Sequence, residues 1–172
     1  MPQRIWFERE FVLGTPFESF PEILERLRGT PARLEERVSQ VPSKDLTRRY
    51  GERWSIQEHV GHLADLEPLW RGRVEDLLGG QEELRHADLE NTATWQAEHN
   101  KAQSEVVLAE FRSQRAELME RLESLSEESL RTATALHPRL RQPMSIVDLC
   151  FFVAEHDDHH LATVSTLIGR TQ

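Results

Sequence analysis

Helical start and stop signals distributed along the chain are the feature that most constrains its fold. Ser55-Ile56-Gln57-Glu58 is a capping box, in which the serine hydroxyl accepts from the glutamate N–H. Ser145 begins a weaker version of the same device, and Gly79-Gly80 is a stop signal. Sustained strand alternation is absent from these regions. The signals predict four main helices, over about 17–40, 55–78, 95–123 and 145–168.

Four helices of this length in a 172-residue chain favour an all-α four-helix bundle, with residues 1–172 forming one domain. The first helix is expected to be interrupted near Gly29, because Thr30-Pro31 offers a capping hydroxyl followed by a proline at the first helical position. The segment Arg4–Leu13 is ambiguous, and we interpret it as an extended N-terminal arm lying on the bundle.

Charge and hydropathy exclude several classes of partner. The chain has 21 Lys and Arg against 30 Asp and Glu, a formal net charge of −9, which argues against nucleic-acid binding by phosphate neutralisation. Its longest apolar run is too short for a membrane span, and no signal-peptide core is present. We therefore expect a cytoplasmic protein that acts on a small molecule. The single Cys150 has apolar neighbours, which predicts a buried, inert thiol.

The eight histidines are the unusual part of the composition. His156 and His160 are one helical turn apart, on a stripe with apolar residues such as Val153, so both should face the bundle interior. Asp157 and Asp158 should point away from that stripe and be solvated. Interior imidazoles need partners, and two readings stay open: hydrogen-bonded core residues, or ligands that reach one cation.

His62 is the predicted third ligand, because it shares a helix face with Leu66 and Leu69. Gly61 beside it either admits a neighbouring element or marks a tight helix crossing. Three neutral imidazoles leave coordination positions open, which is the catalytic pattern. The residues themselves do not choose among zinc, nickel, iron and copper.

Two further residues are candidates for a catalytic role, although none is assigned. His159 is a candidate proton shuttle or outer partner, or else an edge residue. Asp65 is a candidate general base or an orienting partner for His62. The tryptophans that either line a pocket or belong to the core are Trp54, Trp70 and Trp95. The histidines expected at the surface are His86, His99 and His137.

Two motifs together resemble the DinB/YfiT-like metalloenzymes. They are the segment Trp54–Asp65, WSIQEHVGHLAD, and the segment His156–Ala162, HDDHHLA. Shorter stretches fit the YfiT-like branch, namely Pro31–Leu34, Tyr50–Arg53 and His137-Pro138. The resemblance implies an up-down-down-up bundle, a homodimer, and a divalent metal, zinc or nickel. The ligands that it implies are His62, His156 and His160.

The resemblance also implies two kinds of activity. The YfiT-like branch is labelled hydrolytic, whereas some related bundles are transferases or isomerases that use bacillithiol, mycothiol or glutathione. We therefore expect a metal-dependent hydrolase, or an S-transferase with a low-molecular-weight thiol as cosubstrate, in which the metal activates water or the thiol. The alternative is a non-catalytic metal-binding stress-response protein of the DinB family.

Overall fold

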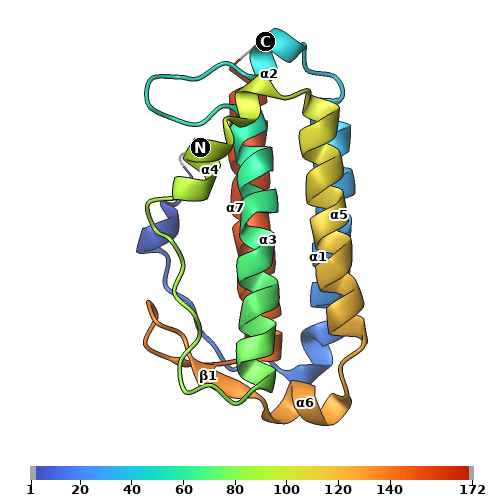
Figure 1. Cartoon of the computed structure of the whole chain (residues 1–172), viewed down its shortest axis with the longest axis vertical. Helices are drawn as coiled ribbons and strands as arrows, with labels where there is room; N and C mark the ends of the chain where they lie inside the picture. The colour runs from blue at the N-terminus through green and yellow to red at the C-terminus, as the bar shows by residue number, and fades with distance from the viewer. Residues whose placement is uncertain (1–2, 171–172) are drawn as a thin grey trace.

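The computed structural model describes residues 3–170 and contains four long helices (Figure 1). These are α1 (Phe20–Val38), α3 (Ile56–Leu78), α5 (Ser104–Glu123) and α7 (Ile146–Ile168). The shorter helices are α2 (Ser43–Leu46), α4 (Thr92–Ala97) and α6 (Glu127–Thr132), with 3-10 turns η1 (Trp6–Glu8), η2 (Phe17–Ser19) and η3 (His99–Lys101). Strands β1 (Thr134–Leu136) and β2 (Pro143–Ser145) form one antiparallel hairpin, with Ala135 opposite Met144.

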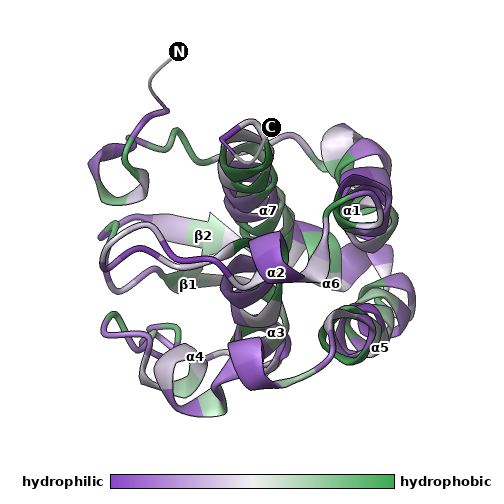
Figure 2. Ribbon diagram, turned by 90° about the horizontal axis from the view of Figure 1, so that it is seen from above, coloured by the Kyte–Doolittle hydropathy of each residue, from purple (hydrophilic) through white to green (hydrophobic). Residues whose placement is uncertain are grey.

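The four long helices run up, down, down and up in chain order (Figure 1). Helix α7 lies beside α1 and α3, and α5 completes the square beside the same two helices (Figure 2). Because α3 and α5 run in the same direction, the connection 79–103 has to return along the full length of the bundle. This connection, the N-terminal arm and the hairpin all lie over the side formed by α3 and α7. The predicted all-α bundle with its arm is confirmed.

The capping chemistry sets the ends of the two helices that matter most for the site. The Ser55 hydroxyl accepts from the Glu58 N–H at 3.1 Å, and the Glu58 carboxylate accepts from the Ser55 N–H. Ser145 and Asp148 form the same reciprocal pair at the start of α7. Helix α3 ends at Gly79, and Gly80 then adopts a positive φ of 68°, which glycine tolerates without strain.

Two local predictions are wrong, and one element was not predicted. Helix α1 is continuous, because the Thr30 hydroxyl bonds the Arg26 carbonyl within the helix instead of capping a new one. The expected helix over 95–123 is broken at Glu98, whose φ of 50° is left-handed, so α4 and η3 precede α5. The hairpin was not predicted, since strands of three residues are too short to show alternation.

A buried charge cluster joins all four long helices. The Arg115 guanidinium of α5 donates to Glu67 of α3 at 2.7 Å, to Asp157 of α7 at 2.6 Å, and to the Leu27 carbonyl of α1. Arg115 is 2% exposed, and both carboxylate residues are fully buried. The expectation that Asp157 is solvated is therefore wrong, because α7 is covered on this side by α1 and α5. Asp158 does lie near the surface, paired with Arg26 and Arg33.

Within the described part of the chain, no helix combines the length and the apolar character needed to cross a membrane.

Candidate metal centre

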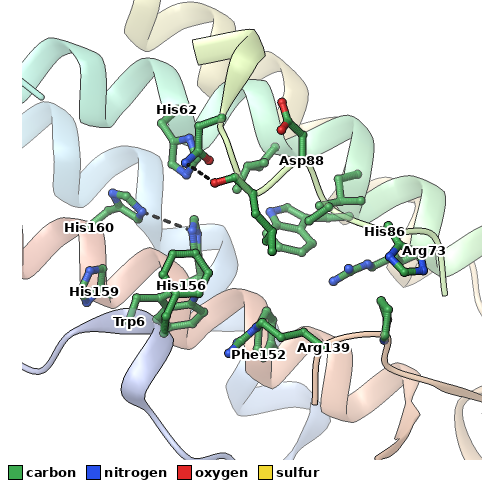
Figure 3. A pocket seen from close by; sticks show the side chains of 18 of the residues that line it. Trp6, His62, Arg73, His86, Asp88, Arg139, Phe152, His156, His159 and His160 are labelled. Atoms are coloured by element: carbon green, nitrogen blue, oxygen red, sulfur yellow. Dashed lines mark hydrogen bonds between the residues drawn. The ribbon is translucent and has the colours of Figure 1, made fainter. Parts of the chain in front are cut away.

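Helices α3 and α7 bring His62, His156 and His160 together, as their spacing predicted (Figure 3). One nitrogen from each ring lies within 4.8 Å of the others, and all three residues are buried. Among residues 3–170, no other group of three or more histidine, cysteine or acidic side chains lies this close. The three imidazoles therefore form the candidate metal centre.

Hydrogen bonds at Nδ1 orient two of the three rings. His62 Nδ1 lies 3.0 Å from the Thr94 hydroxyl, and His160 Nδ1 lies 2.9 Å from His59 Nδ1. When His62 and His160 donate through Nδ1, the lone pair of each Nε2 is free to bind a cation. His156 Nδ1 is buried and has no partner among the described residues.

The separation of the nitrogens fits a shared cation. His156 Nε2 and His160 Nε2 lie 3.2 Å apart. Two imidazole nitrogens bound at roughly 2.0–2.1 Å to one tetrahedral zinc are about 3.3–3.4 Å apart. The donor set is also the correct one, since neutral imidazoles bind zinc and nickel. The residues present therefore fit a divalent metal.

Burial keeps these rings in the neutral form that a metal requires. It lowers the pKa of His62 from 6.5 to about 3 and the pKa of His59 to about 4. For His156 and His160, burial and the neighbouring imidazoles hold the pKa well below its ordinary value. Protons therefore compete weakly for these nitrogens near neutral pH.

The three rings lie in the wall of a cavity of about 460 Å³. Every histidine of the chain except His99 lines this cavity. Its walls are otherwise largely aromatic and aliphatic. The aromatic residues include Trp54, which lies just before α3, Trp70 on α3 and Phe152 on α7. The Trp54 ring centroid lies 4.6 Å from that of His62, so Trp54 does line the pocket. A small, mostly apolar substrate could reach the three imidazoles.

The N-terminal arm closes one side of the cavity. The Trp6 ring meets the His156 imidazole edge-on, with centroids 5.0 Å apart. The Gln3 amide lies 2.9 Å from His159 Nδ1 and donates to the His159 carbonyl at 2.7 Å, and Arg9 pairs with Glu155. His159 is half-buried and lines the cavity. Its Nε2 has no hydrogen-bond partner among the described residues.

Asp65 does not orient His62, the role considered for it from the sequence. Its carboxylate lies 2.9 Å from His99 Nε2, while His62 bonds Thr94 instead. Gly61 makes this pairing possible, because a Cβ at that position would lie 2.3 Å from the His99 ring. Of the two readings of Gly61, close approach of a neighbouring element is the correct one. His99 is partly buried against α3, so the prediction that it is a surface residue is wrong.

Comparison with known proteins agrees with this architecture. The DinB superfamily profile matches residues 14–164. The chain belongs to the DinB superfamily. Among solved structures it is similar to YfiT from Bacillus subtilis, which is described as a probable metal-dependent hydrolase with an unusual four-helix bundle topology. The TM-score is 0.78 at 21% identity, covering 95% of this chain and 94% of YfiT. A comparison with curated proteins finds no match.

Several residues of this DinB bundle site were not found from the sequence. Thr94 lies on the connection 79–103, 32 residues after the His62 ring that it orients. His137, expected at the surface, is only 2% exposed and lines the cavity. Its position follows from the β1–β2 hairpin, which sequence periodicity did not reveal. His86 is exposed, as predicted, at the rim of the cavity.

Proposed function

We propose that this DinB protein is a metal-dependent hydrolase, with a divalent cation, zinc or nickel, held by His62, His156 and His160. The observation that supports this most directly is a cluster of three neutral, buried imidazoles in the wall of a cavity large enough for a small molecule. No fourth ligand of the same kind joins them among the described residues, which leaves room for a reactant. The description of YfiT as a probable metal-dependent hydrolase supports the same class.

When bound, a divalent cation supplies the positive charge that lowers the pKa of water or of a thiol and polarises a carbonyl. The chain supplies the rest. Thr94 and His59 fix the orientation of two ligand rings. Trp6 and Trp54 cover the imidazoles and limit the access of bulk water. We assign proton movement to His159, which borders the cavity and touches the His160 ring.

Thiol transfer is the second reaction that the same site could perform. The chain's own thiol is not available for it, because Cys150 is 2% exposed and burial raises its pKa to about 12. A low-molecular-weight thiol cosubstrate would therefore have to enter the cavity. Asp65 does not line the cavity, and we assign it no part in either reaction.

Metal analysis of untagged protein tests the proposal. We expect about one equivalent of zinc or nickel in wild type and in His86→Ala, a control histidine at the exposed rim. His160→Ala and His62→Ala should lose the metal while circular dichroism shows the bundle intact. Unchanged loading in His160→Ala, or no metal in wild type, would refute it.

Turnover then separates the functional classes. Loaded protein is assayed with a panel of esters and amides in water, and with small thiols plus electrophiles. Metal-dependent hydrolysis supports the hydrolase, and metal-dependent thiol adducts support the S-transferase. Metal loading without turnover on either panel favours a non-catalytic metal-binding stress-response protein.

A further inference from the structure

The end of the cavity away from the three ligand histidines is cationic. Arg73 on α3 and Arg139 on the loop of the hairpin both line the cavity, and Arg73 lies on the opposite side of the view from His160 (Figure 3). Arg73 is 2% exposed, and Nη2 of Arg139 is buried without a hydrogen-bond partner. Within residues 3–170, no carboxylate lies within 4.0 Å of either guanidinium. Neither arginine has a carboxylate in contact, although Asp76, which pairs with Arg85, attracts Arg73 from a longer distance.

His137 adds a third donor to this end. Its Nδ1 accepts from the backbone N–H groups of Arg139 and Leu140, at 3.2 and 3.1 Å. These two bonds place the proton of the neutral ring on Nε2. That Nε2 lies 3.2 Å from Arg73 Nη1, which is also a donor. Arg73 Nε donates to the Arg85 carbonyl at 3.1 Å, so the rest of the Arg73 guanidinium and His137 Nε2 are the donors that an anionic oxygen beside them would satisfy.

The acidic side chain in the cavity wall does not fill this role. Asp88 is the carboxylate among the lining residues, and it accepts from the backbone N–H of Glu90 and of Thr92, at 3.0 and 2.7 Å. It lies more than 4.0 Å from both arginines. His86, another polar residue of the cavity wall, is exposed and pairs with Glu83. Within residues 3–170, neither Arg73 nor Arg139 therefore forms an ion pair by direct contact.

We propose that Arg73, Arg139 and His137 bind the carboxylate of a small substrate whose apolar body extends toward the three ligand histidines. A guanidinium fork matches the planar carboxylate, and the two arginines lie against aromatic rings, Arg73 over Trp70 and Arg139 over Phe7. This inference rests on the proposed function, since it names the substrate class of the same cavity.

The Trp70 ring links the cationic end of the cavity to the candidate metal centre. The Trp70 ring centroid lies 5.5 Å from the Arg73 guanidinium carbon and 5.7 Å from the His156 ring centroid. One indole thus contacts both the cationic end and the candidate metal centre. An aromatic or short-chain carboxylate could hold its charge at Arg73 and place a reactive group beside His156. The arginines then act as specificity-determining residues that do not touch the reacting atoms.

Calorimetric titration with benzoate, its neutral analogue benzamide and inorganic phosphate tests the proposal. Each probe is titrated into zinc-loaded protein and into chelator-treated protein, so that binding at the arginines is separated from binding at the metal. Arg139→Gln removes one guanidinium. Its matched control is Arg141→Gln, which loses the same charge from an exposed residue of the same loop. His137→Asn keeps an acceptor near the Nδ1 position and removes the Nε2 donor.

We expect benzoate to bind both forms of wild type and of Arg141→Gln, and benzamide to bind about tenfold more weakly. Arg139→Gln and His137→Asn should each lose about tenfold in benzoate affinity, with metal content unchanged. Equal benzoate affinity in Arg139→Gln and wild type, no benzoate binding at all, or tighter binding of phosphate than of benzoate would overturn the proposal. Failure of metal loading alone would refute the proposed function and leave the benzoate result standing.

Discussion

Removal of the Arg115 side chain tests how the bundle is held together. Arg115→Met keeps an unbranched chain in the core but deletes the guanidinium that donates to Glu67, Asp157 and the Leu27 carbonyl. Both carboxylates are fully buried, so neither can replace its lost partner with water. The substitution therefore leaves two uncompensated acidic groups at the junction of four helices.

The expected loss in the free energy of unfolding is about 3–5 kcal/mol, the usual cost of removing one partner from a buried ion pair. For a chain of this length, each kcal/mol lowers Tm by about 2–4 °C, so the midpoint should fall by roughly 6–20 °C. Urea denaturation followed by circular dichroism measures the first quantity, and thermal melts measure the second.

Arg112→Met is the matched control on the same helix. Arg112 pairs with Glu35 at the surface, where the Arg112 side chain is 53% exposed. Such a pair contributes about 0–1 kcal/mol because water and salt screen it. A loss in Arg115→Met no larger than the loss in Arg112→Met would refute the assignment of Arg115 as the central buried cation.

Acid should partly rescue the Arg115 variant. Burial raises the pKa of Glu67 above its ordinary 4.5, and the attraction of Arg115 opposes that shift. Without Arg115 the folded protein holds the Glu67 proton more tightly than the unfolded chain does, so lowering the pH favours the fold. The stability gap between variant and wild type should therefore narrow from pH 7 toward about pH 5. A gap that widens on acidification would contradict this reasoning.

Three further outcomes follow from burial. Gly61→Ala should destabilise the protein by about 1–3 kcal/mol, because its Cβ would lie 2.3 Å from the His99 imidazole. Gly29→Ala, where the Cβ has room, should instead stabilise the protein by about 0.5–1 kcal/mol. Urea denaturation of both variants measures the difference. The free energy of unfolding of metal-free protein should fall from about pH 6.5 down to about pH 4, by at most about 1.4 kcal/mol per pH unit for each histidine. The reason is that His62 and His137 have a pKa of about 3 in the folded protein, so they stay neutral while the same residues in the unfolded chain take up protons. Urea midpoints that do not change with pH would contradict this. Cys150 should react with a thiol reagent only in denaturant, and rapid labelling of folded protein would show that it is accessible.

Much of the bundle followed from local sequence signals. The Ser55 and Ser145 caps begin α3 and α7 at the predicted residues, because capping depends on atoms within one helical turn. The break at Glu98 was missed for the opposite reason. Its left-handed backbone lies beside η3, whose His99 packs against Gly61 on another helix. Helix propensity depends on neighbouring residues in the sequence, so it gives no sign of a contact between His99 and a distant helix.

The candidate site divides in the same way. The clustering of His62, His156 and His160 followed from the faces of two helices, since residues three or four apart share one side. The burial of Asp157 did not follow, although it is adjacent to His156. Thr30 of α1 and Arg115 of α5 cover Asp157, so α7 is buried on more than one face, and a hydrophobic stripe marks only the most apolar face.

By itself the sequence determined four helices, their order and the inward direction of three histidines, because these depend on contacts within one or two helical turns. Only the tertiary structure decided what surrounds the histidines. Thr94 reaches His62 from a connection that returns along the bundle, and Arg73 meets His137 across 64 residues of chain. Such pairs depend on how helices and crossings are placed in space. The cationic end of the cavity, and with it the proposed substrate class, therefore became visible only in the folded chain.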